Sequence, residues 1–192
     1  MIQALNLHVL LIFVFCCTAL INSDHYPQFF TATILEWKHL LKKDEFKQII
    51  VDSLLFLKTE GSIVVNAFVI MPNYFHLIWQ IQDGYKQDKI QMRFLKYTAQ
   101  QIKFRLIDTN DKMLNNFFVD ATDREYQFWH RKPLSIDLWT QEVFIQKLIY
   151  IHNNPIKDPW NLVQYPEEYK YSSAKFYESG IDNFNLLTHY KE

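Results

Sequence analysis

The chain has 192 residues, of which 49% are hydrophobic and 17% aromatic, so it can bury the core of one domain and a disordered chain is excluded. Its formal net charge of -1 means that affinity for nucleic acid would have to come from a local basic patch. The three glycines lie far apart and the two cysteines are adjacent, which excludes a P-loop, a GxGxxG dinucleotide loop, a disulfide framework and a cysteine-rich zinc site.

Residues 1–25 form an atypical apolar segment ahead of a single domain over residues 26–192. Within this segment, residues 9–21 are an uncharged apolar run of 13 residues. The run fits the hydrophobic region of a signal peptide and is shorter than the roughly 20 residues of a spanning helix. No Lys or Arg precedes it and no clear cleavage site follows it, so we expect a cytoplasmic protein without a membrane partner. Export, or packing of the run on the domain, is the alternative.

Strands and helices alternate in the first half of the domain. Residues 29–35 are rich in aromatic and β-branched side chains, which predicts a strand. Apolar residues at helical spacing predict a helix over 44–58. Residues 63–71 and 74–81 are predicted to be the two strands of a hairpin. A long helix is predicted over 86–107.

The second half continues the alternation. A polar, acidic loop is expected over 108–125, followed by a strand over 126–132. Thr140 is a suitable N-cap for a helix that ends near Asn153, with turns and a short final segment beyond it. The order β-α-β-β-α-β-α is the split βαβ plan of ferredoxin-like domains plus a carboxy-terminal helix. We therefore predict an α+β fold with an antiparallel sheet.

The third predicted strand carries a candidate metal ligand. Alternation along the strand places Tyr74, His76, Ile78 and Gln80 on one face. A histidine that faces outward from the sheet, with a second ligand two residues away, can hold a divalent metal. The alternative is a hydrogen-bonded structural histidine, which is the commoner role of a single histidine in a strand.

The last predicted helix carries a candidate nucleophile. Gln146, Lys147, Tyr150 and Asn154 are spaced by three and four residues and share a face. Tyr150 would supply a phenol nucleophile, and the Asn154 side-chain oxygen one turn later could ligate Mg²⁺ or Mn²⁺. Lys147 could hold the phenolate or a phosphate. The alternative is a tyrosine at the edge of the core beside a polar helix end.

The long predicted helix carries a stripe of basic residues. Residues 86–105 contain six basic side chains and one acidic side chain, Asp88. Such an excess suits a phosphate backbone, which it would position without reading sequence. The alternative is a solvated helix face. The predicted DNA-binding residues of this stripe are Lys86, Lys89, Arg93, Lys96 and Lys103.

Two motifs resemble one known family. The string MPNYFHLIW at residues 71–79 resembles the MPNHxHL signature of the single-tyrosine HUH transposases, and YIHNNPIK at 150–157 with YPEEYKYSSA at 165–174 resembles their carboxy-terminal signature. Specifically, the chain resembles the REP-associated tyrosine transposases, an IS200-like branch. The resemblance runs from about residue 26 to the end.

The resemblance implies an HUH nuclease fold, a metal-assisted reaction on single-stranded hairpin DNA, and a role in DNA transposition and recombination. In such enzymes two histidines bind a divalent metal, and a helix tyrosine attacks the scissile phosphate to leave a 5′-phosphotyrosine link. On this chain the implied nucleophile is Tyr150, the second histidine is His76 and the third ligand is Asn154. Mg²⁺ or Mn²⁺ is the implied cofactor, and a homodimer is an open alternative.

One residue departs from the family pattern. The position of the first metal histidine holds Tyr74. A phenol with a pKa near 10 is a poor ligand at neutral pH, so the metal site is expected to be weakened. The alternatives are an active transposase, a catalytically silent or decaying DNA-binding relative, and an unrelated ferredoxin-like sheet that binds RNA through exposed aromatic side chains.

Overall fold

A four-stranded antiparallel sheet is the centre of the fold. The computed structural model describes residues 26–192, so the predicted apolar segment lies outside the described residues. The strand order is β2-β3-β1-β6, with every neighbouring pair antiparallel. The strands are β1 (Gln28–Thr33), β2 (Ile63–Ile70), β3 (Tyr74–Ile81) and β6 (Leu134–Asp137). This order confirms the predicted split βαβ plan and the α+β class.

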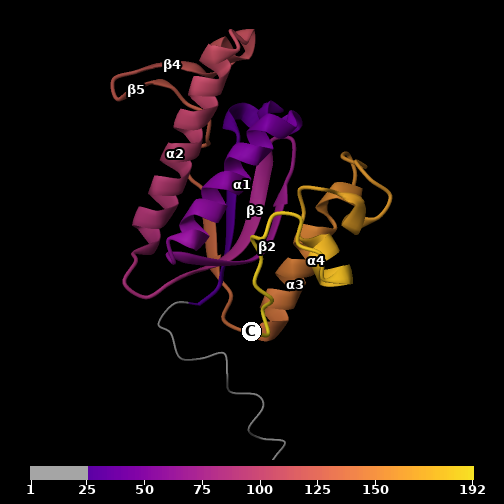
Figure 1. Cartoon of the computed structure of the whole chain (residues 1–192). Coiled ribbons are helices and arrows are strands. Elements are labelled where there is room, and N and C mark those ends of the chain that lie inside the picture. The colour runs from indigo at the N-terminus through magenta and orange to yellow at the C-terminus, as the bar shows by residue number, and fades with distance from the viewer. Residues whose placement is uncertain (1–25) are drawn as a thin grey trace, which may run out of the picture.

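Two helices cover one face of the sheet. They are α1 (Asp44–Thr59) and α2 (Gln87–Asp108), which lie side by side in Figure 1. Alternation along β3 directs Phe75, Leu77 and Trp79 toward them, and all three side chains are fully buried. The main core therefore lies between this face and the two helices.

The opposite face of the sheet is covered by α3 (Gln141–His152), with the short helix α4 (Ala174–Ser179) nearby (Figure 1). Ile78 of β3 packs there with Phe144, Leu148 and Ile151 of α3 in a second, smaller core. His76 points to the same face as Ile78, so it lies on the side of the sheet that α3 covers. No helix of residues 26–192 has the length and apolar character needed to cross a membrane.

The start of α3 is fixed by the predicted cap. The Thr140 side chain accepts a hydrogen bond from the Val143 backbone N–H at 3.3 Å. We expect Thr140→Ala to lower the free energy of unfolding by about 1 kcal/mol, because one backbone donor of the first turn loses its partner. Urea titration measures this effect. Thr140→Ser keeps the oxygen and should retain most of the stability; equal losses in both variants would contradict the capping role.

The prediction of a strand over 126–132 was wrong. The fourth strand of the sheet is β6, and β5 (Arg124–Tyr126) pairs with β4 (Phe118–Ala121) in a separate two-stranded hairpin. Tyr126 belongs to β5, whereas Phe128 and Trp129, which also suggested a strand, are buried in the main core. Trp129 donates its indole N–H to the Thr98 hydroxyl of α2 at 3.0 Å, and Phe128 packs on the ring of Phe117.

The predicted loop over 108–125 also has more structure than expected. It contains a 3-10 turn and the β4 strand, because its apolar side chains, such as Phe117, return to the core. The other predicted elements agree with the observed ones to within about two residues. The 3-10 turns are Leu35–Trp37, Leu40–Lys42, Lys112–Phe117, Asn154–Ile156 and Pro166–Glu168.

Candidate active site between β3 and the end of α3

His76 lies between the sheet and α3, where it is 6% exposed. It faces away from the main core as alternation predicts, but α3 covers it, so it does not face solvent. Its Nδ1 is 2.7 Å from the hydroxyl of Thr31, its register partner on β1, and its Nε2 has no hydrogen-bond partner within residues 26–192. Burial, followed by the nearby Lys147 charge, lowers the pKa of His76 to about 3. The imidazole is therefore neutral at neutral pH.

Tyr74 lies beside His76, with their ring centroids 4.8 Å apart. Its hydroxyl donates a hydrogen bond to Oδ1 of Asn154 at 2.7 Å. Burial raises the pKa of Tyr74 to about 12, and repulsion between its phenolate and that of Tyr150 adds to the effect. Tyr74 is consequently a protonated hydrogen-bond donor and not a phenolate.

Asn154 joins the end of α3 to β3. It is 5% exposed and begins the 3-10 turn that follows the helix. Its amide donates to the backbone carbonyl of Tyr150 at 2.6 Å while its oxygen accepts from Tyr74. The side chain thus satisfies one of the unpaired carbonyls at the helix end and fixes the last turn of α3 against the sheet.

Tyr150 is the exposed member of the cluster, with 41% of its surface accessible. Its ring centroid is 5.3 Å from that of His76 and 6.0 Å from that of Phe29. The Nζ atoms of Lys147 and Lys157 lie 5.7 Å and 5.2 Å from the same centroid. Lys157 was not predicted as a site residue, although it is the last residue of the YIHNNPIK string.

The structure therefore brings Tyr74, His76, Lys147, Tyr150 and Asn154 together, although three of them come from a helix end far from β3 in the sequence. These groups can bind an anion beside an accessible phenol. Two lysines flank the phenol, and the neighbouring imidazole has a buried nitrogen without a partner among the described residues.

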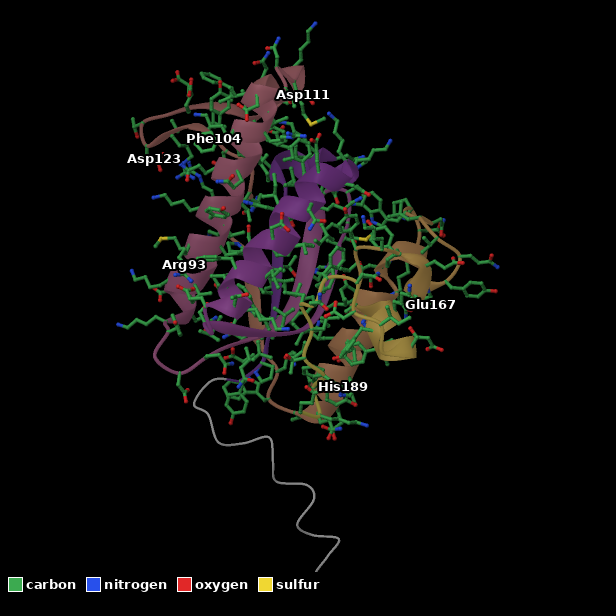
Figure 2. All side chains as sticks on the ribbon, in the orientation of Figure 1. Arg93, Phe104, Asp111, Asp123, Glu167 and His189 are labelled. Atoms are coloured by element: carbon green, nitrogen blue, oxygen red, sulfur yellow. The ribbon has the colours of Figure 1, made fainter. Side chains whose placement is uncertain are left out.

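The basic stripe lies elsewhere. It belongs to α2, which covers the other face of the sheet, and Figure 2 shows Arg93 on the side of α2 away from α3. Arg93 and Lys103 form ion pairs with Glu60 and Glu125, and Lys89 lies 3.8 Å from its neighbour Asp88. A strand bound at Tyr150 could reach this stripe only by passing from one layer to the other, so its role in DNA binding stays a prediction.

The residues present do not make a strong Mg²⁺ or Mn²⁺ site. The free Nε2 of His76 would suit a metal. However, Tyr74 keeps its proton and directs it at the Asn154 oxygen, which is the other candidate donor. In residues 26–192 no three His, Cys, Asp or Glu side chains lie close enough together to hold a metal ion. A divalent cation would also be repelled by the lysines beside Tyr150.

The buried histidines predict loss of stability in acid. The pKa of His76 falls to about 3 and that of His152 to about 4, both through burial, whereas an unfolded histidine titrates near 6.5. Between these values the unfolded state binds protons that the folded state cannot, so stability falls as the pH falls below 6.5. For His76 alone, we expect about 2 kcal/mol less unfolding free energy at pH 5 than at pH 7.

Urea titrations at pH 7, 6 and 5 measure this loss. His76→Asn should reduce the pH dependence, while His130→Gln, at an exposed histidine, should leave it unchanged. Equal stability at pH 5 and pH 7 would contradict the burial of both imidazoles.

The chain matches no protein-family model and no curated protein. Its structure is similar to that of a REP-associated tyrosine transposase bound to a REP hairpin, with a TM-score of 0.58 and 16% sequence identity over 88% of this chain and 90% of the other. A candidate transposase from Deinococcus radiodurans is also similar, with a TM-score of 0.47 and 14% identity over 69% and 92% of the two chains. The first likeness shows a shared fold, and that fold is the one the sequence motifs predict.

Proposed function

We propose that this chain is a transposase of the REP-associated tyrosine type, which binds single-stranded DNA containing a hairpin and uses Tyr150 as the nucleophile of strand cleavage. The observation that carries the proposal is the placement of Tyr150. The backbone of this accessible tyrosine is held by Asn154 near the end of α3, and its ring lies beside the histidine of the MPNYFHLIW motif. The fold it shares with a solved hairpin-bound transposase supports the same conclusion.

The reaction that Tyr150 would perform is a transesterification. The phenol oxygen attacks the phosphorus, the bond from phosphorus to the 3′ oxygen breaks, and the phenol proton ends on that leaving oxygen. The products are a 5′-phosphotyrosine link and a free 3′-OH. Because the energy of the phosphodiester is retained in the link, the reverse reaction can rejoin strands. Lys147 and Lys157 flank the phenol and can stabilise negative charge on the phosphate.

We further propose that this copy cleaves slowly. Tyr74 replaces a metal-binding imidazole with a protonated phenol, and the loss of even an indirect contributor to a metal site costs about 10–100-fold in affinity or activity. We expect hairpin binding to be retained, because the lysines beside Tyr150 are still in place.

Hairpin binding is the direct test. Labelled single strands from the DNA flanking the gene are titrated with protein, and a hairpin strand should bind at least tenfold more tightly than an unstructured strand of the same composition. The affinity should fall steeply with salt, since each neutralised phosphate of a single strand adds about 0.7 to the logarithmic slope. Equal affinity for both strands would contradict the proposal. Preference for an RNA hairpin would favour the RNA-binding alternative.

A further inference from the structure

The two lysines beside Tyr150 form no ion pair with a carboxylate of the described residues. In the part of the chain that the structure describes, ion pairs neutralise most of the basic side chains of α2, but none involves Lys147 or Lys157. Lys147 instead lies over the rings of Phe29 and Tyr150, and Lys157 lies over the ring of Tyr150. Two positive charges from different elements thus converge on one accessible phenol without an internal counter-ion.

A buried donor lies in the same place. The Nε2 atom of His76 has no hydrogen-bond partner in the part of the chain that the structure describes, although the residue is more than nine-tenths buried and a buried nitrogen usually has one. The Thr31 hydroxyl, 2.7 Å from Nδ1, can donate to that nitrogen, which puts the ring proton on Nε2. Nε2 is fully covered in this structure, so this N–H would reach an anionic oxygen bound among Tyr150 and the lysines only after the Tyr150 ring turns aside.

Tyr74 completes the arrangement. Its hydroxyl already donates a hydrogen bond to the Asn154 side-chain oxygen. That oxygen is therefore not free to ligate a divalent cation. The site therefore has positive charge and hydrogen-bond donors in place of a cation and its ligands. Such a set binds phosphate oxygens directly.

We propose that Lys147, Lys157 and His76 Nε2 form a phosphodiester-binding site at Tyr150 that works without a divalent metal. This inference rests on the proposed function for its natural ligand, a single DNA strand. The anion site itself can be tested without a hairpin, because a dinucleotide carries the same phosphodiester.

The test follows the ring signal of Tyr150 by NMR in the full chain labelled with ¹³C at its tyrosine rings. The signal is identified by its absence in Tyr150→Phe. Thymidylyl-thymidine is titrated in EDTA and again in Mg²⁺, with inorganic phosphate as a second probe. We expect saturable shifts of the Tyr150 signal with affinities that agree within twofold in EDTA and Mg²⁺. Lys147→Gln with Lys157→Gln should weaken binding about tenfold or more, and Lys112→Gln, at an exposed lysine of a distant turn, should not change it.

Lys157→Gln alone is the control for misfolding of the double variant, because Lys157 is exposed. It should weaken binding by a smaller factor. Loss of the response in EDTA would overturn the inference, as would unchanged affinity in the lysine variants. The two proposals can fail separately. Hairpin binding without a dinucleotide response at Tyr150 overturns only the metal-free site, whereas a dinucleotide response without hairpin preference overturns only the proposed function.

Discussion

With Mn²⁺ present, Tyr74→His is expected to form at least about tenfold more covalent protein–DNA product than the wild-type chain. The substitution places a second imidazole on the face of β3 that carries His76. It also removes the phenol hydroxyl that donates to the Asn154 oxygen. Both changes favour a divalent cation. The product is measured as a shifted band when labelled hairpin DNA from the gene's flanks is incubated with protein and run on a denaturing gel. EDTA should remove the gain.

Tyr74→Phe is the matched control for this experiment. It also releases the Asn154 oxygen and keeps the aromatic ring, but it adds no ligand, so we expect no gain in covalent product. An equal gain in the Phe and His variants would show that the release of Asn154, and not the imidazole, limits the reaction. Equal product from wild type and Tyr74→His would contradict the view that Tyr74 weakens the site.

Much of the fold was predictable because its signals are local. Alternation along residues 74–81 assigned Phe75, Leu77 and Trp79 to one face and Tyr74 and His76 to the other, and the structure has these same faces. The spacing of four residues between Tyr150 and Asn154 likewise predicts that they lie one helical turn apart. The structure agrees, because the Asn154 amide donates to the Tyr150 carbonyl at 2.6 Å. Periodicity and caps depend on neighbours in sequence, so the sequence contains them.

Features that depend on tertiary packing were not predictable in the same way. The sequence around Trp129 resembles that of a strand, yet Phe128 and Trp129 pack in the main core. The strand that completes the sheet is the less hydrophobic Leu134–Asp137. The basic stripe of α2 could be read from the sequence, but its partners Glu60 and Glu125 come from other elements.

The same limit applies to the candidate site. Nothing in the spacing of Tyr74 and Asn154, which are 80 residues apart, indicates that the phenol would donate to the amide. Burial of His76 likewise follows from the position of α3 over the sheet and not from β3 itself. The motif resemblance could have identified Lys157, since it lies in the matched string, but only the fold places it beside the Tyr150 ring.

In the Tyr74→His background, Tyr150→Phe is expected to abolish the covalent product while hairpin affinity stays within about twofold. The substitution removes only the nucleophilic oxygen, and the exposed ring can keep its contacts with His76 and Phe29. Tyr97→Phe is the matched control, because Tyr97 is similarly exposed (50%) but lies on α2, on the other face of the sheet. Product that survives in the Tyr150→Phe variant would mean that another group attacks the phosphate. Loss of both hairpin affinity and covalent product would mean that the Tyr150 hydroxyl contributes to binding rather than to attack. The proposed transfer of the phenol proton to the leaving oxygen would then be contradicted.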